Sequence, residues 1–227
     1  MSQLDLITLT DPRSSASEAY RTLRTNLEFS SLEHPLQSLL VTCAATADKS
    51  NMVANLAVIM AEGGRRVILV DGDLRRPALH EIFKLDNTQG LADLARPGQG
   101  LADQDADLDA LLQESGVDGL RVLTSGPLPQ NPSVLLGSPG MTQAIAALTA
   151  RADLVLFDAP PVLAVTDASL LAARVDGTLL VVRAGGTRRE HVEQAKDLLS
   201  KVNARLVGAA LTNARLDGAF TSYYGQT

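Results

Sequence analysis

The segment from Ser38 to Ala57 constrains the fold more than any other part of this sequence, because it joins an apolar run, a short turn and a Lys-Ser pair. This succession is the layout of a phosphate-binding loop, in which a buried strand leads through a turn into a helix. Backbone N–H groups of the turn and of the helix N-terminus would then face a phosphate. We therefore expect a strand over about Ser38–Thr42, a helix over about Asn51–Glu62, and a nucleotide-binding turn between them.

The turn lacks the glycines that such loops normally contain. In the pattern G-x-x-x-x-G-K-[S/T], counting back from Lys49 puts the two glycines at the positions of Cys43 and Asp48. Glycine lets the backbone approach a phosphate closely or adopt a positive φ angle, whereas aspartate adds bulk and negative charge. The turn therefore retains the lysine and the serine of a phosphate loop but lacks its two glycines.

The charge of Asp48 bears directly on ATP binding. At an effective dielectric constant of about 20, two like charges about 4 Å apart repel by roughly 4 kcal/mol, which is about a thousandfold in affinity. The repulsion is smaller if the carboxylate turns away or binds a metal. As an alternative, Asp48 forms an ion pair with Lys49 or with Arg183 and takes the place of the phosphate as an internal anion. The local chemistry favours impaired nucleotide binding.

Two further apolar runs end in aspartate. Val67–Val70 is followed by Asp71 and Asp73, and Leu154–Phe157 is followed by Asp158. The carboxyl ends of parallel strands border the crevice in which α/β sheets bind ligands. Carboxylates there can hold Mg²⁺ or orient an attacking hydroxyl group. The sequence therefore predicts an acidic cluster beside the phosphate loop.

Strands and helices alternate along the rest of the chain. Strands are expected over Leu120–Thr124, Thr178–Arg183 and Leu206–Thr212. Helices are expected from Arg75 towards Phe83 and, with an amphipathic pattern, over Arg189–Lys201. The alternation predicts a doubly wound, mostly parallel α/β sheet with right-handed crossovers, of the P-loop NTPase type. With 227 residues, of which 45% are hydrophobic, one domain can bury a full core.

The expected division has three parts. Residues 1–17 form an N-terminal arm with an extended start, residues 18–215 form the kinase-like P-loop domain, and residues 216–227 form a flexible tail that contains tyrosines. Within the first part, Ser14 to Ser17 are candidates for the N-cap of a helix over about Glu18–Phe29.

Composition excludes several functions. The net charge is −6, aromatic residues make up 3% of the chain and no basic cluster occurs, so a nucleic-acid partner is not expected. A single cysteine fits a reducing compartment. No apolar run approaches the roughly 20 residues needed to cross a bilayer, and the first residues do not resemble a signal peptide. A cytoplasmic protein is therefore expected.

Glu18, Arg21 and Arg24 recur every third residue and so lie along one face of the N-terminal helix. Glu18 can pair with Arg21, and the guanidinium groups can reach a carboxylate on another chain. A solvated helix face explains the same spacing, and the spacing alone does not decide between the two interpretations.

Five sequence blocks, taken together, resemble the bacterial tyrosine kinases of capsule and exopolysaccharide assembly, the BY-kinase family. The blocks are EAYRTLRTN at 18–26, KS with ANLA at 49–50 and 54–57, VDGDLRRP at 70–77, GPLPQNP at 126–132, and FDAPPVLAVTDA at 157–168. Because their order and spacing extend over nearly the whole chain, the sequence is identified as a member of this family.

The resemblance implies ATP and Mg²⁺ as cofactors, and it implies roles for individual residues. Lys49 would bind phosphate and Ser50 would ligate Mg²⁺. Asp71 and Asp73 would take part in Mg²⁺ binding and in activating the attacking tyrosine hydroxyl, and Asp158 is the Walker B aspartate. The residues implied to bind nucleotide are Thr46, Asp48, Lys49, Ser50, Asn51 and Asn213.

The family also suggests partners. Its E-x-x-R-x-x-R motif, here Glu18, Arg21 and Arg24, is used in contacts between subunits, so a homo-oligomer is expected. Its tyrosine-rich tail is phosphorylated on a neighbouring subunit, which makes Tyr223 and Tyr224 the candidate acceptors. The family's membrane activator would have to be a separate chain that recruits this one to the inner face of the membrane.

Three functions are open on this reading. One is an active autokinase that phosphorylates Tyr223 or Tyr224 of a neighbour. The second, which the altered loop favours, is a pseudokinase that keeps the fold as a scaffold and needs no cofactor. The third and least supported is a partitioning-type ATPase, whose additional lysine early in the loop is replaced here by Ala44 or Ala45.

Overall fold

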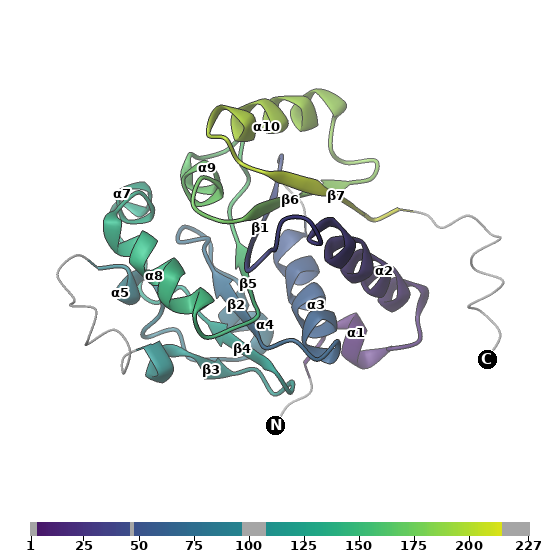
Figure 1. Ribbon diagram of the computed structural model, residues 1–227, viewed down its shortest axis with the longest axis horizontal. Coiled ribbons are helices and arrows are strands. Elements are labelled where there is room, and N and C mark those ends of the chain that lie inside the picture. Colours follow the sequence, from purple (N-terminus) through teal and green to yellow (C-terminus); the bar gives the residue numbers. More distant parts are fainter. Residues whose placement is uncertain (1–3, 46–47, 97–107, 215–227) are drawn as a thin grey trace.

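The computed structural model describes residues 4–45, 48–96 and 108–214 (Figure 1). These residues form a sheet of seven strands in the order β3-β4-β2-β5-β1-β6-β7. All neighbouring strands are parallel except β3 and β4. The strands are β1 (Ser38–Cys43), β2 (Val67–Asp71), β3 (Gln113–Glu114), β4 (Leu120–Leu123), β5 (Leu154–Asp158), β6 (Gly177–Arg183) and β7 (Leu206–Thr212).

Helices cover both faces of the sheet (Figure 1). One face packs against α1 (Ile7–Thr10), α2 (Ser15–Ser30), α3 (Lys49–Glu62) and α4 (Leu79–Phe83). The other face packs against α5 (Leu91–Leu94), α7 (Pro132–Leu136), α8 (Pro139–Thr149), α9 (Asp167–Ala172) and α10 (Arg189–Lys201). The doubly wound, mostly parallel α/β sheet is therefore confirmed.

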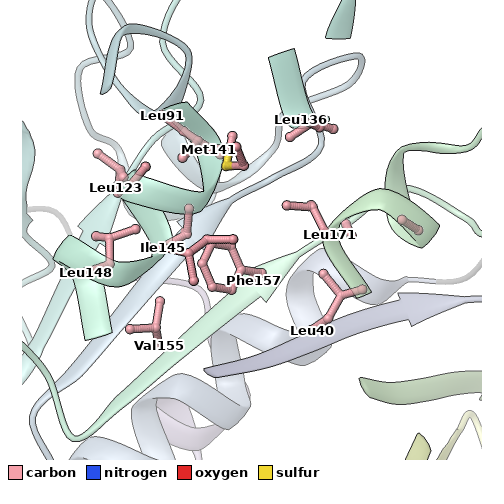
Figure 2. Packing of buried hydrophobic residues seen from close by; sticks show 14 of the residues in the cluster. Leu40, Leu91, Leu123, Leu136, Met141, Ile145, Leu148, Val155, Phe157 and Leu171 are labelled. Carbon is pink, nitrogen blue, oxygen red and sulfur yellow. The ribbon is translucent and has the colours of Figure 1, made fainter. Parts of the chain in front are cut away.

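The central strands are apolar because they are buried on both faces. Every residue of β1, β2 and β5 is buried, and successive side chains alternate between the two hydrophobic clusters. Leu40 points into one cluster and Leu39 into the other. Figure 2 shows the cluster that contains Leu40, in which Phe157 of β5 lies among Leu40, Met141 and Leu171.

The central helix α3 carries the phosphate-loop lysine at its first residue. Its apolar residues are buried on all sides, because α3 lies between the sheet and the outer helix α2. Gly63 follows its last turn, as the sequence predicts. The helix begins two residues before the expected Asn51. Lys49 and Ser50 therefore belong to the helix N-terminus itself.

Two segments differ from the sequence-based expectation. The extended start contains a helical turn, α1, because Leu6 is fully buried and Asn55 of α3 accepts hydrogen bonds from the backbone N–H of Thr8 (3.1 Å) and from its hydroxyl (2.9 Å). The helix expected to begin at Arg75 starts only at Leu79, because the preceding residues wrap around an aspartate carboxylate. Ser14 is the N-cap of α2, as expected, and accepts a hydrogen bond from Ser17 N–H.

The N-terminal segment is thus part of the hydrophobic core, and truncation of Leu6 tests this. Leu6→Ala should lower the free energy of unfolding by about 2–5 kcal/mol, because it removes a buried side chain and leaves a cavity. Urea denaturation measures the change. Leu32→Ala is the matched control, since Leu32 is 74% exposed and its truncation should change stability by no more than about 0.5 kcal/mol. Equal stability of the two variants would contradict the packing described here.

Candidate functional site

The candidate site lies where β1, β2 and β5 end. Asp71 and Asp158 are the last residues of β2 and β5, and they are paired in the register of these neighbouring strands. The chain leaves β1 next to them and enters α3 at Lys49. Sheet topology therefore brings together three segments that are far apart in sequence, as expected for the carboxyl edge of a parallel sheet.

Lys49, Ser50 and Asp158 form a connected buried cluster. The Lys49 amine forms an ion pair with Asp158 Oδ1. The Ser50 hydroxyl donates a hydrogen bond to Asp158 Oδ2 at 2.5 Å, and Lys49 Nζ lies 3.3 Å from the Ser50 oxygen. Asp158 is inaccessible to solvent and Lys49 nearly so. Both oxygens of the carboxylate are thus occupied by groups of the phosphate loop.

Electrostatics keep this lysine charged despite its burial. Burial by itself lowers the pKa of Lys49, but the charge of Asp158 and its hydrogen bond oppose this and the pKa is raised overall. Burial raises the pKa of Asp158, while the lysine and the serine hydroxyl act to lower it. A protonated lysine amine is the group that binds the β- and γ-phosphates of a nucleotide in phosphate-loop proteins.

Asp71 organises the loop that follows β2. Its carboxylate accepts hydrogen bonds from the backbone N–H groups of Asp73 (3.3 Å), Ala78 (3.0 Å) and Leu79 (2.9 Å). Burial and the nearby charge of Asp158 raise the pKa of Asp71 to about 7, although the hydrogen bonds from Leu79 and Ala78 act to lower it. A carboxylate with a pKa near neutrality can accept and release a proton under physiological conditions.

Asp73 lies in the same loop and is almost fully buried. Its Oδ1 accepts hydrogen bonds from the backbone N–H groups of Arg75 (3.3 Å) and Arg76 (3.0 Å). Its charge contributes to the raised pKa of Lys49, so the carboxylate faces the cluster. Within the described residues no hydrogen bond involves Asp73 Oδ2, which leaves this oxygen available to a cation.

Gly72 allows the two acidic loops to approach each other. Its N–H donates a hydrogen bond of 2.8 Å to the carbonyl oxygen of Asp158. A Cβ atom at this position would lie 2.9 Å from the same oxygen, closer than real Cβ atoms come to backbone. Any other residue here would push the loop of Asp71 and Asp73 away from Asp158.

The donor set fits Mg²⁺ in a particular way. Ser50, Asp73 and Asp158 supply oxygen atoms, which Mg²⁺ prefers, and nucleotide-bound Mg²⁺ takes only one or two carboxylates while keeping waters and phosphate oxygens. In the described parts of the chain, no three histidine, cysteine or acidic side chains are grouped so that they could enclose a metal ion. The residues therefore fit a cation that arrives with a phosphate ligand rather than a metal held by protein alone.

Asp48 precedes α3 and is exposed to solvent. Its backbone has φ −77° and ψ 63°, a region open to residues with a side chain, so the position does not require glycine's freedom here. The alternative in which Asp48 forms an ion pair with Lys49 or Arg183 is wrong, because Lys49 pairs with Asp158 and the described residues include no ion pair of Asp48. Its charge does act on Tyr20 of α2, whose pKa burial and Asp48 together raise to about 12.

Two other residues predicted to bind nucleotide, Asn51 and Asn213, form no hydrogen bond with the acidic cluster in the described part of the chain. Asn51 is in the first turn of α3, where its side-chain and backbone oxygens accept hydrogen bonds from the Asn55 amide. Asn213 follows β7, has a left-handed backbone (φ 55°), and borders a cavity of about 470 Å³ between α2 and β7. Thr46, Tyr223 and Tyr224 lie outside the described residues.

The three residues of the expected subunit contact lie on α2, and all three have partners within their own chain. Glu18 forms an ion pair with Arg21, as the spacing predicts, and Arg21 also donates to the carbonyl of Pro12 at 2.8 Å. Arg24 donates to the carbonyl of Ile59 in α3 at 3.1 Å. The subunit contact itself stays a prediction, and Arg24 in addition joins α2 to α3.

Sequence reasoning missed two buried polar connections around the site. Asn55 links α1 to α3 through Thr8, and its only signal was an asparagine flanked by apolar residues in the middle of the helix. Arg75 forms an ion pair with the buried Asp167, which lies far along the chain in the block that also contains Asp158. No periodicity connects those two positions.

No family model matches the chain, but its sequence is similar to those of several bacterial tyrosine-protein kinases. It is 39% identical over 225 residues to the tyrosine-protein kinase YwqD of Bacillus subtilis, covering 98% of this chain and 92% of that protein. It is 36% identical over 218 residues to the putative tyrosine-protein kinase CapB of Staphylococcus aureus, covering 95% and 92%.

Solved structures agree with this relationship. The kinase domain of Escherichia coli tyrosine kinase ETK has a TM-score of 0.87 at 30% identity and covers 96% of this chain and 84% of that one. The chimerical protein CapA2B2 has a TM-score of 0.83 at 34% identity, covering 91% and 88%. The septum site-determining protein MinD of Pyrococcus horikoshii, complexed with Mg-ADP, shares the fold alone, with a TM-score of 0.62 at 20% identity.

The raised pKa of Asp71 predicts a pH-dependent stability. Because its pKa in the native state, about 7, exceeds the ordinary value of 3.8, the native state binds more protons than the unfolded state between these values. Stability is therefore lost as pH rises through this window. Relative to Asp71→Asn, the wild-type protein should lose about 3 kcal/mol of unfolding free energy between pH 5 and pH 8.

Urea denaturation at several pH values measures this difference in slope. The substitution also changes hydrogen bonds to the loop, but to a similar extent at each pH, so only the divergence of the two curves carries the prediction. Parallel curves for the two proteins would show that Asp71 titrates at its ordinary pKa.

Proposed function

The chain belongs to the bacterial tyrosine-protein kinases, and from this premise we propose that it is an ATP- and Mg²⁺-dependent kinase of capsule or exopolysaccharide assembly whose activity is limited by weak nucleotide binding. One observation carries the proposal. The buried cluster of Lys49, Ser50 and Asp158 lies beside Asp71 and Asp73 at one edge of the sheet. Asp71 and Asp73 are buried and form no ion pair with the described residues. Because burying a carboxylate without an ion-pair partner is costly, their presence beside the cluster favours a catalytic role.

Each residue of the cluster has a role in phosphoryl transfer. Lys49 and the N-terminus of α3 bind the phosphates of ATP. Ser50, Asp73 and Asp158 hold the Mg²⁺, which when bound neutralises the charge that develops on the transferred phosphoryl group. Asp71, with a pKa near 7, accepts the proton of the attacking tyrosine hydroxyl.

The acceptor tyrosines would come from another molecule. The candidates are Tyr223 and Tyr224, phosphorylated in trans within a homo-oligomer formed through Glu18, Arg21 and Arg24 of α2. A separate membrane protein of polysaccharide export would recruit and activate the chain at the inner face of the membrane. The described part of the chain contains no helix of the length and apolarity that a membrane span requires.

Asp48 limits the affinity for ATP. Its backbone conformation is unstrained and its side chain reaches solvent, which removes the steric objection to a phosphate but not the electrostatic one. The negative charge of Asp48 lies at the N-terminus of α3, where we expect the phosphates of ATP to bind. With solvent screening, we expect this repulsion to cost about 2 kcal/mol of binding free energy, which corresponds to a roughly thirtyfold higher dissociation constant for ATP.

A second candidate is a scaffold that keeps the fold and its surfaces without binding ATP. One observation favours it, namely that the Lys49 amine already has a buried carboxylate partner in Asp158. An entering phosphate would have to share the lysine with that carboxylate. The partitioning-type ATPase is a minor alternative, because the likeness to MinD extends to the fold alone.

Calorimetric titration with ATP·Mg²⁺ separates the two candidates. Under the favoured proposal, wild-type protein binds with a dissociation constant weaker than tens of micromolar, Asp48→Gly binds about thirtyfold more tightly, and Lys49→Met does not bind. An Asp48→Gly protein that still shows no binding would support the scaffold, whereas tight binding by wild-type protein would remove the role given to Asp48.

Light scattering tests the assembly. Arg21→Ala combined with Arg24→Ala should reduce the mass of the particle, and Arg21→Ala alone should do so without removing the hydrogen bond from Arg24 to α3. Arg189→Ala is a matched control, because Arg189 is a solvent-exposed arginine of α10 that pairs with Glu193 in the same helix. An unchanged mass for the α2 variants would remove these residues from the interface.

A further inference from the structure

A buried carboxylate on α9 holds the loop that contains Asp73. Asp167 is the first residue of α9, and its side chain is fully buried. Arg75 donates to both of its oxygens, from Nε to Oδ2 at 2.7 Å and from Nη2 to Oδ1 at 3.2 Å. Two parallel hydrogen bonds between a guanidinium and a carboxylate set direction as well as distance, which a single contact does not.

Ser133 of α7 completes this ion pair. Its hydroxyl donates to Asp167 Oδ1 at 2.7 Å and lies 3.1 Å from Nη2 of Arg75. Burial acts to raise the pKa of Asp167, but the hydrogen bonds from Arg75 and Ser133 outweigh it and hold this pKa below its usual value. The carboxylate is therefore charged at neutral pH and keeps the arginine in place.

The backbone of Arg75 contacts Asp73. The backbone N–H of Arg75 donates to Asp73 Oδ1, so one residue contacts Asp167 through its side chain and Asp73 through its backbone. Asp167 belongs to the helix that follows the loop after Asp158. The ion pair thus ties the loop after β2 to the segment after β5, in addition to the contact of Gly72 with the Asp158 carbonyl.

We propose that Arg75 and Asp167 are a positioning pair that fixes the Asp73 carboxylate relative to Asp158, so that both carboxylates can bind the Mg²⁺ of one nucleotide complex. This inference rests on the proposed function. Neither residue touches the nucleotide, and Arg75 acts through the loop that it anchors. Such supporting contacts commonly change metal affinity by about 10- to 100-fold when removed.

A purely structural ion pair would behave differently. It would lower the stability of the fold and weaken nucleotide binding equally with and without metal. A positioning pair should weaken only the part of the binding that depends on Mg²⁺, because Lys49 binds phosphate without help from Asp73. The metal dependence of binding therefore separates the two roles.

The chain offers a matched control for this test. Arg75→Lys keeps the positive charge but removes the two-pronged hydrogen bond. Arg76→Lys makes the same change one residue further on, at an arginine that is exposed and whose side chain has no hydrogen bond or ion pair to the described residues. Asp167→Asn removes the charge of the other partner, and thermal unfolding verifies that each variant is folded.

The measurement is binding of a fluorescent ADP analogue to the full chain, in EDTA and across a Mg²⁺ titration. Arg75→Lys and Asp167→Asn should raise the half-saturating Mg²⁺ concentration by about tenfold or more. Neither substitution should change the affinity measured in EDTA. Arg76→Lys should match wild type under both conditions. Wild-type Mg²⁺ dependence in Arg75→Lys would overturn the proposal, as would an equal loss with and without metal.

Failure of the proposed function gives a different result. If wild-type protein binds the analogue under neither condition, hydrogen exchange of residues 72–79 in the free protein decides whether the pair holds this loop. Faster exchange in Arg75→Lys but not in Arg76→Lys would support the anchoring, and unchanged exchange in both would overturn it.

Discussion

The ion pair between Lys49 and Asp158 is the interaction on which the rest of the site depends. It joins the first residue of α3 to the last residue of β5 inside the protein, where an unpaired charge of either sign would be strongly destabilising. With Ser50 on the second carboxylate oxygen, the pair sets the position of the helix N-terminus relative to the sheet. A phosphate that enters the site would meet a lysine that is already charged and oriented.

The acidic loop after β2 is built around this pair in a way that serves both folding and chemistry. Asp71 accepts three backbone hydrogen bonds, and these oblige the chain to curl before α4 can begin. Gly72 brings the loop against β5, and Arg75 ties it to α9. The residues proposed for catalysis are therefore also the residues that shape the loop, so substitutions here affect stability and activity together.

Much of the fold could be predicted from the sequence, because apolar runs that end in charge or in glycine reflect local rules. The strands over Leu206–Thr212 and the helix over Arg189–Lys201 have the predicted bounds. The errors occurred where distant residues decide the local structure. Helix α1 forms because Asn55 binds Thr8. Helix α4 starts later than expected because the Asp71 carboxylate accepts hydrogen bonds from the N–H groups of Ala78 and Leu79.

The sequence by itself determined the family, the parallel α/β sheet and the set of charged residues at its carboxyl edge, since strand order along the chain and short blocks of residues carry that information. The tertiary structure alone decided how these charges are paired. It paired Lys49 with Asp158 rather than with Asp48, and Arg75 with Asp167, because ion pairs between distant segments depend on which strands and helices become neighbours. Burial, which raises the pKa of Asp71 and of Asp158, is likewise a property of the packed molecule rather than of any segment.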